Sequence, residues 1–303
     1  MYKKTEGFSL ILVAMSLLIA GLIGFAGWRV LSRKEDNVTN TAASKPVQQS
    51  ASVVEPSKQT VAEKAPDAPS TLESPAKVQT VDGKQYLYYG YPAGHNNASP
   101  KKVLVTIHGT GGNASEDYNV WRPAITGTGF ALASLNWWDG EGDATSDYNT
   151  PAQVVSYIHD FLKTQGYTQK DTIVFEGFSR GSANSYSIVA LDKASTDSYI
   201  DAAVSSSGGQ TDAYFNMTTT TIAAKQLPTI YKGVYWILAC GGKDPNPERD
   251  GCTAMQKSAT FVEAKGATVL GILSDDAAAH GALNTSTKNL TKQMFDLITA
   301  KLP

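Results

Sequence analysis

The chain has 303 residues, of which 42% are hydrophobic and 18% are charged, and its formal net charge at neutral pH is −2. Such a nearly neutral chain lacks the basic excess that attracts phosphate backbones, so we expect no nucleic-acid partner. The length suits one large domain or two small ones, but the composition changes along the chain and indicates that its first quarter is not globular.

The first element in chain order is an apolar segment near the N-terminus. Residues 7–28 carry no charged side chain, and charged residues flank them on both sides. About 20 apolar residues in a helix cross the hydrocarbon core of a membrane. A cleaved secretory signal has a shorter apolar stretch that ends in small residues, whereas this one ends in Trp28 and Arg29. We therefore predict a transmembrane anchor at residues 1–34, with a cleaved signal as the alternative.

The residues from Lys4 to Ile11 resemble the leader of a type IV prepilin, which a peptidase cuts after the glycine. The similarity covers about a dozen positions and departs from the family's pattern at Leu12, where that family has the glutamate used in pilus assembly. An ordinary signal anchor therefore remains the preferred interpretation of this segment.

Residues 35–77 form the next segment, which is rich in Ala, Ser, Thr, Val, Gln and Pro and contains no aromatic residue. This composition predicts an extended, disordered linker without a core. The basic residues on both sides of the anchor leave its orientation undecided by the positive-inside rule. A stalk of this kind suits a domain displayed away from a surface, so we predict a single-pass protein of the cell membrane with its folded domain outside the cytoplasm.

The chain contains 2 cysteines, Cys240 and Cys252, which lie close together in sequence. One close pair in an otherwise cysteine-free chain is typical of a disulfide made in an oxidising compartment. Two reduced, unlinked cysteines are the alternative.

Residues 78–303 have the pattern of one globular domain, in which apolar runs alternate with helical patterns. Strands are expected at Val78–Val81, Gln85–Tyr91, Val103–Ile107, Phe130–Asn136, Thr172–Glu176, Ala202–Ser206, Val234–Ala239 and Thr268–Leu273. Helices are expected after Thr150 up to Gln165, and at Arg180–Leu191, Thr253–Lys265 and Ser286–Lys301. Continuous apolar strands between helices predict a mostly parallel sheet covered on both faces, a three-layer αβα sandwich with an antiparallel hairpin at one edge.

The sequence Gly177-Phe178-Ser179-Arg180-Gly181 lies between an expected strand and an expected helix. In that context Gly-x-Ser-x-Gly is a nucleophile elbow, since the sharp turn needs small residues two positions before and after the serine. Ser179 is therefore the candidate nucleophile. The alternative is a glycine-rich turn with a capping serine.

Four elements in this order resemble those of α/β-hydrolases: His108-Gly109-Thr110-Gly111 after a strand, the Ser179 elbow, Asp244 after a later strand, and His280 before the last helix. The resemblance spans residues 78–303 and implies the α/β-hydrolase fold. It also implies hydrolysis of a carboxylic ester through an acyl-enzyme, with no cofactor and no metal. Secreted esterases of this kind act on acylated polysaccharides, feruloyl esters, polyesters or lipids.

The same resemblance assigns roles to single residues. His280 is the expected base and Asp244 the acid that orients it, although Asp250, Asp275 and Asp276 lie near enough in sequence to replace Asp244. The remaining histidines are less suited, because His159 falls inside an expected helix and His95 in a polar loop before the core.

The oxyanion donors are expected to be backbone N–H groups. Arg180, the residue after the nucleophile, supplies one, and Gly109 or Thr110 supplies the second, with Thr110 preferred. His108 then has a structural role. A phosphate-binding loop is the competing interpretation of these glycines, but no Gly-Lys-Ser/Thr sequence follows them.

Trp137 and Trp138 follow an expected strand at the carboxyl end of the sheet, where α/β proteins bind ligands. They either stack on a sugar or aromatic ring of a substrate or pack the pocket wall. Together with surface display they favour an acylated carbohydrate as the ester, and residues 211–232 are a candidate lid. A displayed adhesin that keeps the fold without the activity is the alternative function.

Overall fold

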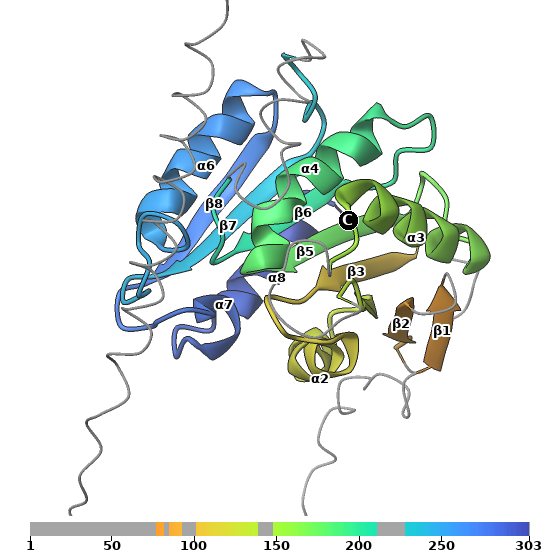
Figure 1. The fold of residues 1–303 in the computed structure, drawn as a ribbon, viewed down its shortest axis with the longest axis horizontal. Helices are drawn as coiled ribbons and strands as arrows, with labels where there is room; N and C mark the ends of the chain where they lie inside the picture. The colour runs from red at the N-terminus through yellow and green to blue at the C-terminus, as the bar shows by residue number, and fades with distance from the viewer. Residues whose placement is uncertain (1–76, 82–84, 93–100, 139–147, 211–227, 303) are drawn as a thin grey trace, which may run out of the picture. The chain divides into compact units, whose positions relative to one another are not determined.

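The computed structural model describes residues 77–81, 85–92, 101–138, 148–210 and 228–302 (Figure 1). The predicted anchor at residues 1–34 and, apart from residue 77, the predicted linker at residues 35–77 lie outside the described residues, as does most of the candidate lid. Among the described residues no helix is both long and apolar enough to cross a membrane.

An eight-stranded sheet forms the middle layer, in the order β1-β2-β4-β3-β5-β6-β7-β8. Its strands are β1 (Lys77–Val81), β2 (Gln85–Gly90), β3 (Lys102–Ile107), β4 (Ala131–Leu135), β5 (Thr172–Phe178), β6 (Ala202–Ser206), β7 (Tyr235–Gly241) and β8 (Thr268–Asp275). The pairs β1–β2 and β2–β4 are antiparallel, and all other neighbouring strands are parallel. This arrangement confirms the predicted sheet, with its hairpin at one edge.

Helices cover the two faces of the sheet. The described helices are α2 (Ala114–Ile125), α3 (Pro151–Thr164), α4 (Arg180–Ala194), α6 (Cys252–Ala264), α7 (Ala282–Thr285) and α8 (Leu290–Thr299). Buried side chains of α3, α4 and α6 share one hydrophobic cluster with the sheet, and those of α2, α7 and α8 share the other. The predicted three-layer sandwich therefore holds for the described part of the chain.

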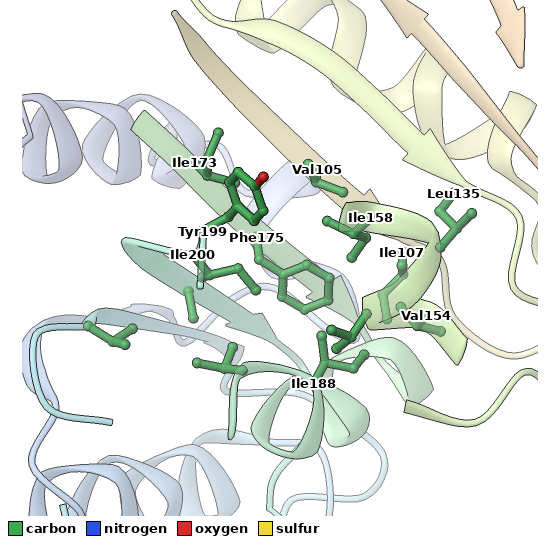
Figure 2. Close-up of a cluster of buried hydrophobic side chains, with 14 of the residues drawn as sticks. Val105, Ile107, Leu135, Val154, Ile158, Ile173, Phe175, Ile188, Tyr199 and Ile200 are labelled. Carbon is green, nitrogen blue, oxygen red and sulfur yellow. The ribbon is translucent and has the colours of Figure 1, made fainter. Parts of the chain in front are cut away.

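Successive residues of a central strand serve different cores, which explains why these strands read as continuous apolar runs. In β3, Val105 and Ile107 belong to the first cluster, whereas Leu104 belongs to the second. Figure 2 shows part of the first cluster, in which Ile158 of α3 and Ile188 of α4 belong to the same group of buried side chains as Val105 and Ile107 of the sheet. Each fully buried side chain of this kind stabilises the fold by about 1.5–3 kcal/mol.

The local sequence predicted some helix ends correctly and others wrongly. Thr150 begins α3 with a capping box to Gln153, as its position before Pro151 predicted. The helix expected at Ser286–Lys301 is in fact α8, which begins later because Asn289 caps it and accepts a hydrogen bond from the N–H of Lys292. Ser286 instead donates its hydroxyl to Asp275 Oδ2 at 2.6 Å.

Helix α2 was not predicted. Its sequence mixes polar and apolar residues, includes Pro123, and buries Ala114, Asp117, Tyr118, Trp121 and Ile125. The helix begins at a cap, where Asn113 accepts a hydrogen bond from the N–H of Glu116 at 3.0 Å.

Candidate active site

Ser179 lies on a strained turn between β5 and α4. Its backbone has φ 54° and ψ −115°, a conformation that L-residues rarely adopt. A Cβ at Gly177 would lie 2.5 Å from the carbonyl oxygen of Gly181, and one at Gly181 would lie 2.7 Å from the carbonyl oxygen of Ile107. Both flanking glycines are thus required sterically, as the elbow pattern predicted.

His280 approaches Ser179 from the loop that follows β8. Its Nε2 lies 2.9 Å from Ser179 Oγ, and its ring centroid lies 5.1 Å from that of Phe178. The loop can come this close because Gly241 has no side chain: a Cβ there would lie 2.1 Å from the carbonyl oxygen of Ala279. The imidazole keeps 31% of its side-chain surface exposed, so a substrate can reach it.

Asp244 is the acid that contacts this histidine. Its Oδ2 lies 2.7 Å from His280 Nδ1, and its Oδ1 accepts a hydrogen bond from the N–H of Asn246 at 2.8 Å. The carboxylate is fully buried. An acceptor at Nδ1 keeps the proton on that nitrogen, so Nε2 is left with the lone pair that can accept the hydroxyl proton of Ser179.

The other three candidate acids make no hydrogen bond to His280 among the described residues. Asp275 accepts hydrogen bonds from Ser286 Oγ and from the N–H of Ala277, and Asp276 is exposed. Asp250 is bound by Arg249, whose Nε donates to its carboxylate at 2.8 Å.

Asp250 nevertheless lies close to the site. One carboxylate oxygen of Asp250, one of Asp244 and one ring nitrogen of His280 all lie within 4.8 Å of one another. Because both nitrogens of His280 already have partners and Arg249 occupies Asp250, these groups fit a proton-transfer network better than a metal centre.

A disulfide closes the loop that carries the acid. Cys240 at the end of β7 is bonded to Cys252 at the start of α6, with a Cα–Cα distance of 5.1 Å. The disulfide predicted from the cysteine spacing is therefore present, and it ties Asp244 between a strand and a helix.

The loop after β3 brings backbone N–H groups to the nucleophile. Gly109 packs so closely that a Cβ there would lie 2.9 Å from Ser179 Cβ. Next to it, Thr110 is exposed, and its N–H makes no hydrogen bond to another described residue. Arg180 is the first residue of α4, and the positive end of a helix dipole lies at this terminus. These are the positions predicted for the oxyanion donors.

His108 forms a hydrogen bond within this loop. It is buried, and burial lowers its pKa to about 4, so the ring is neutral at pH 7. Its Nδ1 donates to the carbonyl oxygen of Gly109 at 2.8 Å. The hydrogen bond orients the peptide that carries the Thr110 N–H, and His108 therefore has the structural role expected from the sequence.

The two tryptophans have different surroundings. Trp137 is completely buried and donates its Nε1–H to the carbonyl oxygen of His108 at 2.9 Å. Of the two roles considered for it, this burial favours packing, because no ring face reaches the surface. Trp138 is only partly buried and stacks on Tyr148 with ring centroids 6.0 Å apart.

Tyr148 was missed by the sequence analysis. Its hydroxyl accepts a hydrogen bond from the N–H of Gly111 at 2.9 Å, and the guanidinium carbon of Arg180 lies 4.4 Å from its ring centroid. A single tyrosine shortly before a helix cap carries no sequence signal, so only the tertiary structure shows this contact.

A group of buried polar side chains lies beneath the site on the α2 face of the sheet. Asp117 of α2 accepts a hydrogen bond from Thr106, which is 2.7 Å from Ser134 Oγ. Burial raises the pKa of Asp117 to about 6. Glu176, three residues before the nucleophile, is fully buried, and burial followed by repulsion from Asp117 raises its pKa well above the ordinary value.

No protein-family model matches the chain, and no curated protein matches its sequence. Solved structures do match its fold. A predicted CIB-like hydrolase from Thermoplasma acidophilum is 13% identical, with a TM-score of 0.51 over 76% of this chain and 99% of its own. The esterase Est2 from Thermogutta terrifontis is 17% identical, with a TM-score of 0.52 over 75% of this chain and 91% of its own.

An esterase from Pyrobaculum calidifontis is 13% identical, with a TM-score of 0.54 over 76% of this chain and 86% of its own. The chain has the α/β-hydrolase fold. At this level of identity, the activity of an α/β-hydrolase has to be inferred from the residues of its own site.

Proposed function

We propose that this α/β-hydrolase cleaves carboxylic esters through an acyl-enzyme on Ser179. The observation that carries the proposal is the hydrogen-bonded chain from Asp244 through His280 to Ser179, at 2.7 Å and 2.9 Å, with the serine on an elbow. A serine hydroxyl is a weak nucleophile at neutral pH, and a base within hydrogen-bond reach activates it.

In the proposed first half-reaction, Ser179 Oγ attacks the ester carbonyl carbon while His280 Nε2 takes the hydroxyl proton. Asp244 stabilises the resulting imidazolium, and the N–H groups of Arg180 and Thr110 bind the oxyanion. Collapse of the tetrahedral intermediate breaks the C–O bond to the alcohol, which leaves with the proton from His280. A water molecule then repeats the sequence on the acyl-enzyme, giving the carboxylic acid and free Ser179.

Two finer assignments belong to the same proposal. The ester is an acylated carbohydrate, for which the partly exposed Trp138, stacked on Tyr148, offers an aromatic side chain. The enzyme is held at the cell membrane by residues 7–28 and acts outside the cytoplasm. The apolar segment, the proline-containing linker and the disulfide support that location.

The decisive experiment uses the chain without residues 1–34, with p-nitrophenyl acetate and p-nitrophenyl butyrate as substrates and a fluorophosphonate as an active-site label. Turnover and labelling are expected for the parent and absent in Ser179→Ala. Ser195→Ala, which removes a partly exposed serine at the C-terminal cap of α4, is the matched control and should keep both. A folded parent that neither turns over nor labels would contradict the enzyme and favour a displayed binding domain.

A further inference from the structure

The oxyanion hole of the proposed esterase is assembled from two segments far apart in sequence. Arg180 belongs to the start of α4, and Thr110 belongs to the loop after β3. Both N–H groups must lie about 2.7–3.1 Å from one oxygen atom in the transition state. Any contact that fixes the loop against the elbow therefore acts on the rate of the chemical step.

The loop itself is a tight turn whose peptides need to be held. The N–H of Gly112 donates to the carbonyl oxygen of Gly109 at 3.3 Å, and Gly111 between them has φ +69°. Thr110, the second residue of the turn, does not have positive φ. A hydrogen-bonded turn with positive φ at its third residue alone is of type II, and rotation of its central peptide converts it to type I. The central peptide here ends in the N–H of Gly111.

Tyr148 binds that central peptide. Its hydroxyl accepts the Gly111 N–H at 2.9 Å and so favours the type II form. The preceding peptide is held through the carbonyl oxygen of Gly109 by His108 Nδ1 at 2.8 Å. The peptide with the Thr110 N–H and the peptide after it are thus each held by one buried side chain.

The ring of Tyr148 also touches the elbow. The guanidinium of Arg180 lies over it at 4.4 Å from the centroid, within the range of a cation–π contact. The ring is 4% exposed and is held on other sides by Trp137, at a centroid distance of 4.6 Å, and by Trp138. One buried side chain therefore contacts both segments that supply the proposed oxyanion donors.

We propose that Tyr148 is a positioning residue that keeps the Thr110 and Arg180 N–H groups placed so that both can bind the oxyanion. The inference rests on the proposed esterase function. It adds a residue that touches neither the substrate nor the reacting atoms and that acts through the backbone of Gly111 and the side chain of Arg180.

Tyr148→Phe tests the inference, because it removes only the hydroxyl and keeps the ring against Arg180. We expect kcat to fall about 10-fold with KM within about 2-fold of the parent, since one hydrogen bond that aligns a donor is lost. A trifluoromethyl ketone, which forms a tetrahedral oxyanion adduct on the serine, should bind about 10-fold more weakly.

The matched control is Tyr231→Phe, which removes another buried tyrosine hydroxyl. That hydroxyl donates to the carbonyl oxygen of Tyr186 at 2.8 Å and belongs to the packing of α4. It should lower the melting temperature as Tyr148→Phe does but leave kcat and ketone affinity unchanged. If Tyr148→Phe does not fold, Arg180→Met is the second variant. It removes the cation–π contact between Arg180 and the Tyr148 ring, and it should show the same selective loss of kcat and ketone affinity.

The outcomes separate the two proposals. A parent without turnover and without fluorophosphonate labelling overturns the esterase function itself. An active parent whose Tyr148→Phe variant keeps kcat and ketone affinity overturns the positioning role alone, and so does a variant that loses no more than Tyr231→Phe.

Discussion

The buried carboxyl of Asp117 makes the stability of this protein depend on pH in a way that one substitution should remove. Asp117 lies on α2, under the strands that carry the elbow and the oxyanion loop, and accepts a hydrogen bond from Thr106. Asp117→Asn keeps the size of the side chain and an oxygen acceptor, but it cannot ionise. The difference between parent and variant therefore isolates the cost of a buried charge.

The magnitude follows from the pKa of Asp117. Burial raises that pKa from 3.8 to about 6 in the folded state. Below pH 3.8 the carboxyl is protonated in both states. As the pH rises from 3.8 to 6 the unfolded chain releases the proton while the folded chain retains it, so the free energy of unfolding falls. Each pKa unit corresponds to about 1.4 kcal/mol, which gives a loss of about 3 kcal/mol by pH 7.

Urea unfolding followed by tryptophan fluorescence at several values between pH 4 and pH 7.5 measures this effect. Because part of the loss has already occurred at pH 4, the stability of the variant relative to the parent should rise by about 2.5 kcal/mol between the ends of that range. Asp160→Asn, which neutralises an exposed acid on α3, is the control and should show a nearly constant difference. A difference that stays constant for Asp117→Asn as well would refute the raised pKa and the buried-charge reasoning with it.

Two further predictions concern the acid loop. Replacing Cys240 and Cys252 by serine opens a loop with a sequence separation of 12 and should lower the free energy of unfolding by about 3 kcal/mol, measured in urea under non-reducing conditions; an unchanged midpoint would contradict it. Asp244→Asn should lower kcat by about 10³- to 10⁴-fold through the wrong histidine tautomer, whereas Asp250→Asn should cost less than about 10-fold. The reverse order in steady-state kinetics would make Asp250 the triad acid.

The sequence by itself determined the features that depend on neighbouring residues. The elbow at Ser179 was predictable because its strain is local, and Gly177 and Gly181 are the residues that such a turn tolerates. The central strands were predictable because a sheet buried on both faces requires continuous apolar runs. The start of α3 followed from Thr150 and Pro151 alone, since a cap involves only the first turn of a helix.

The order of residues along the chain narrowed the choice of catalytic residues but did not decide which acid contacts His280. Four acids lay within reach of His280 in sequence, and only the packing of the loop after β7 against the histidine loop selects Asp244. The direction of a side chain across such a gap depends on the angles between elements, which no local pattern records. The burial of Trp137 was undecided for the same reason.

Tertiary structure alone decided the features with no periodic or motif signal. Helix α2 escaped the sequence analysis because its buried stripe includes the charged residue Asp117 and its last turn contains Pro123, a residue that ordinarily ends a helix. Tyr148 belongs to no recognisable sequence motif. Only in the folded chain does its hydroxyl accept a hydrogen bond from the Gly111 N–H and its ring contact Arg180. The sequence therefore determined which residues can do the chemistry, and long-range packing decided which side chains hold them in place.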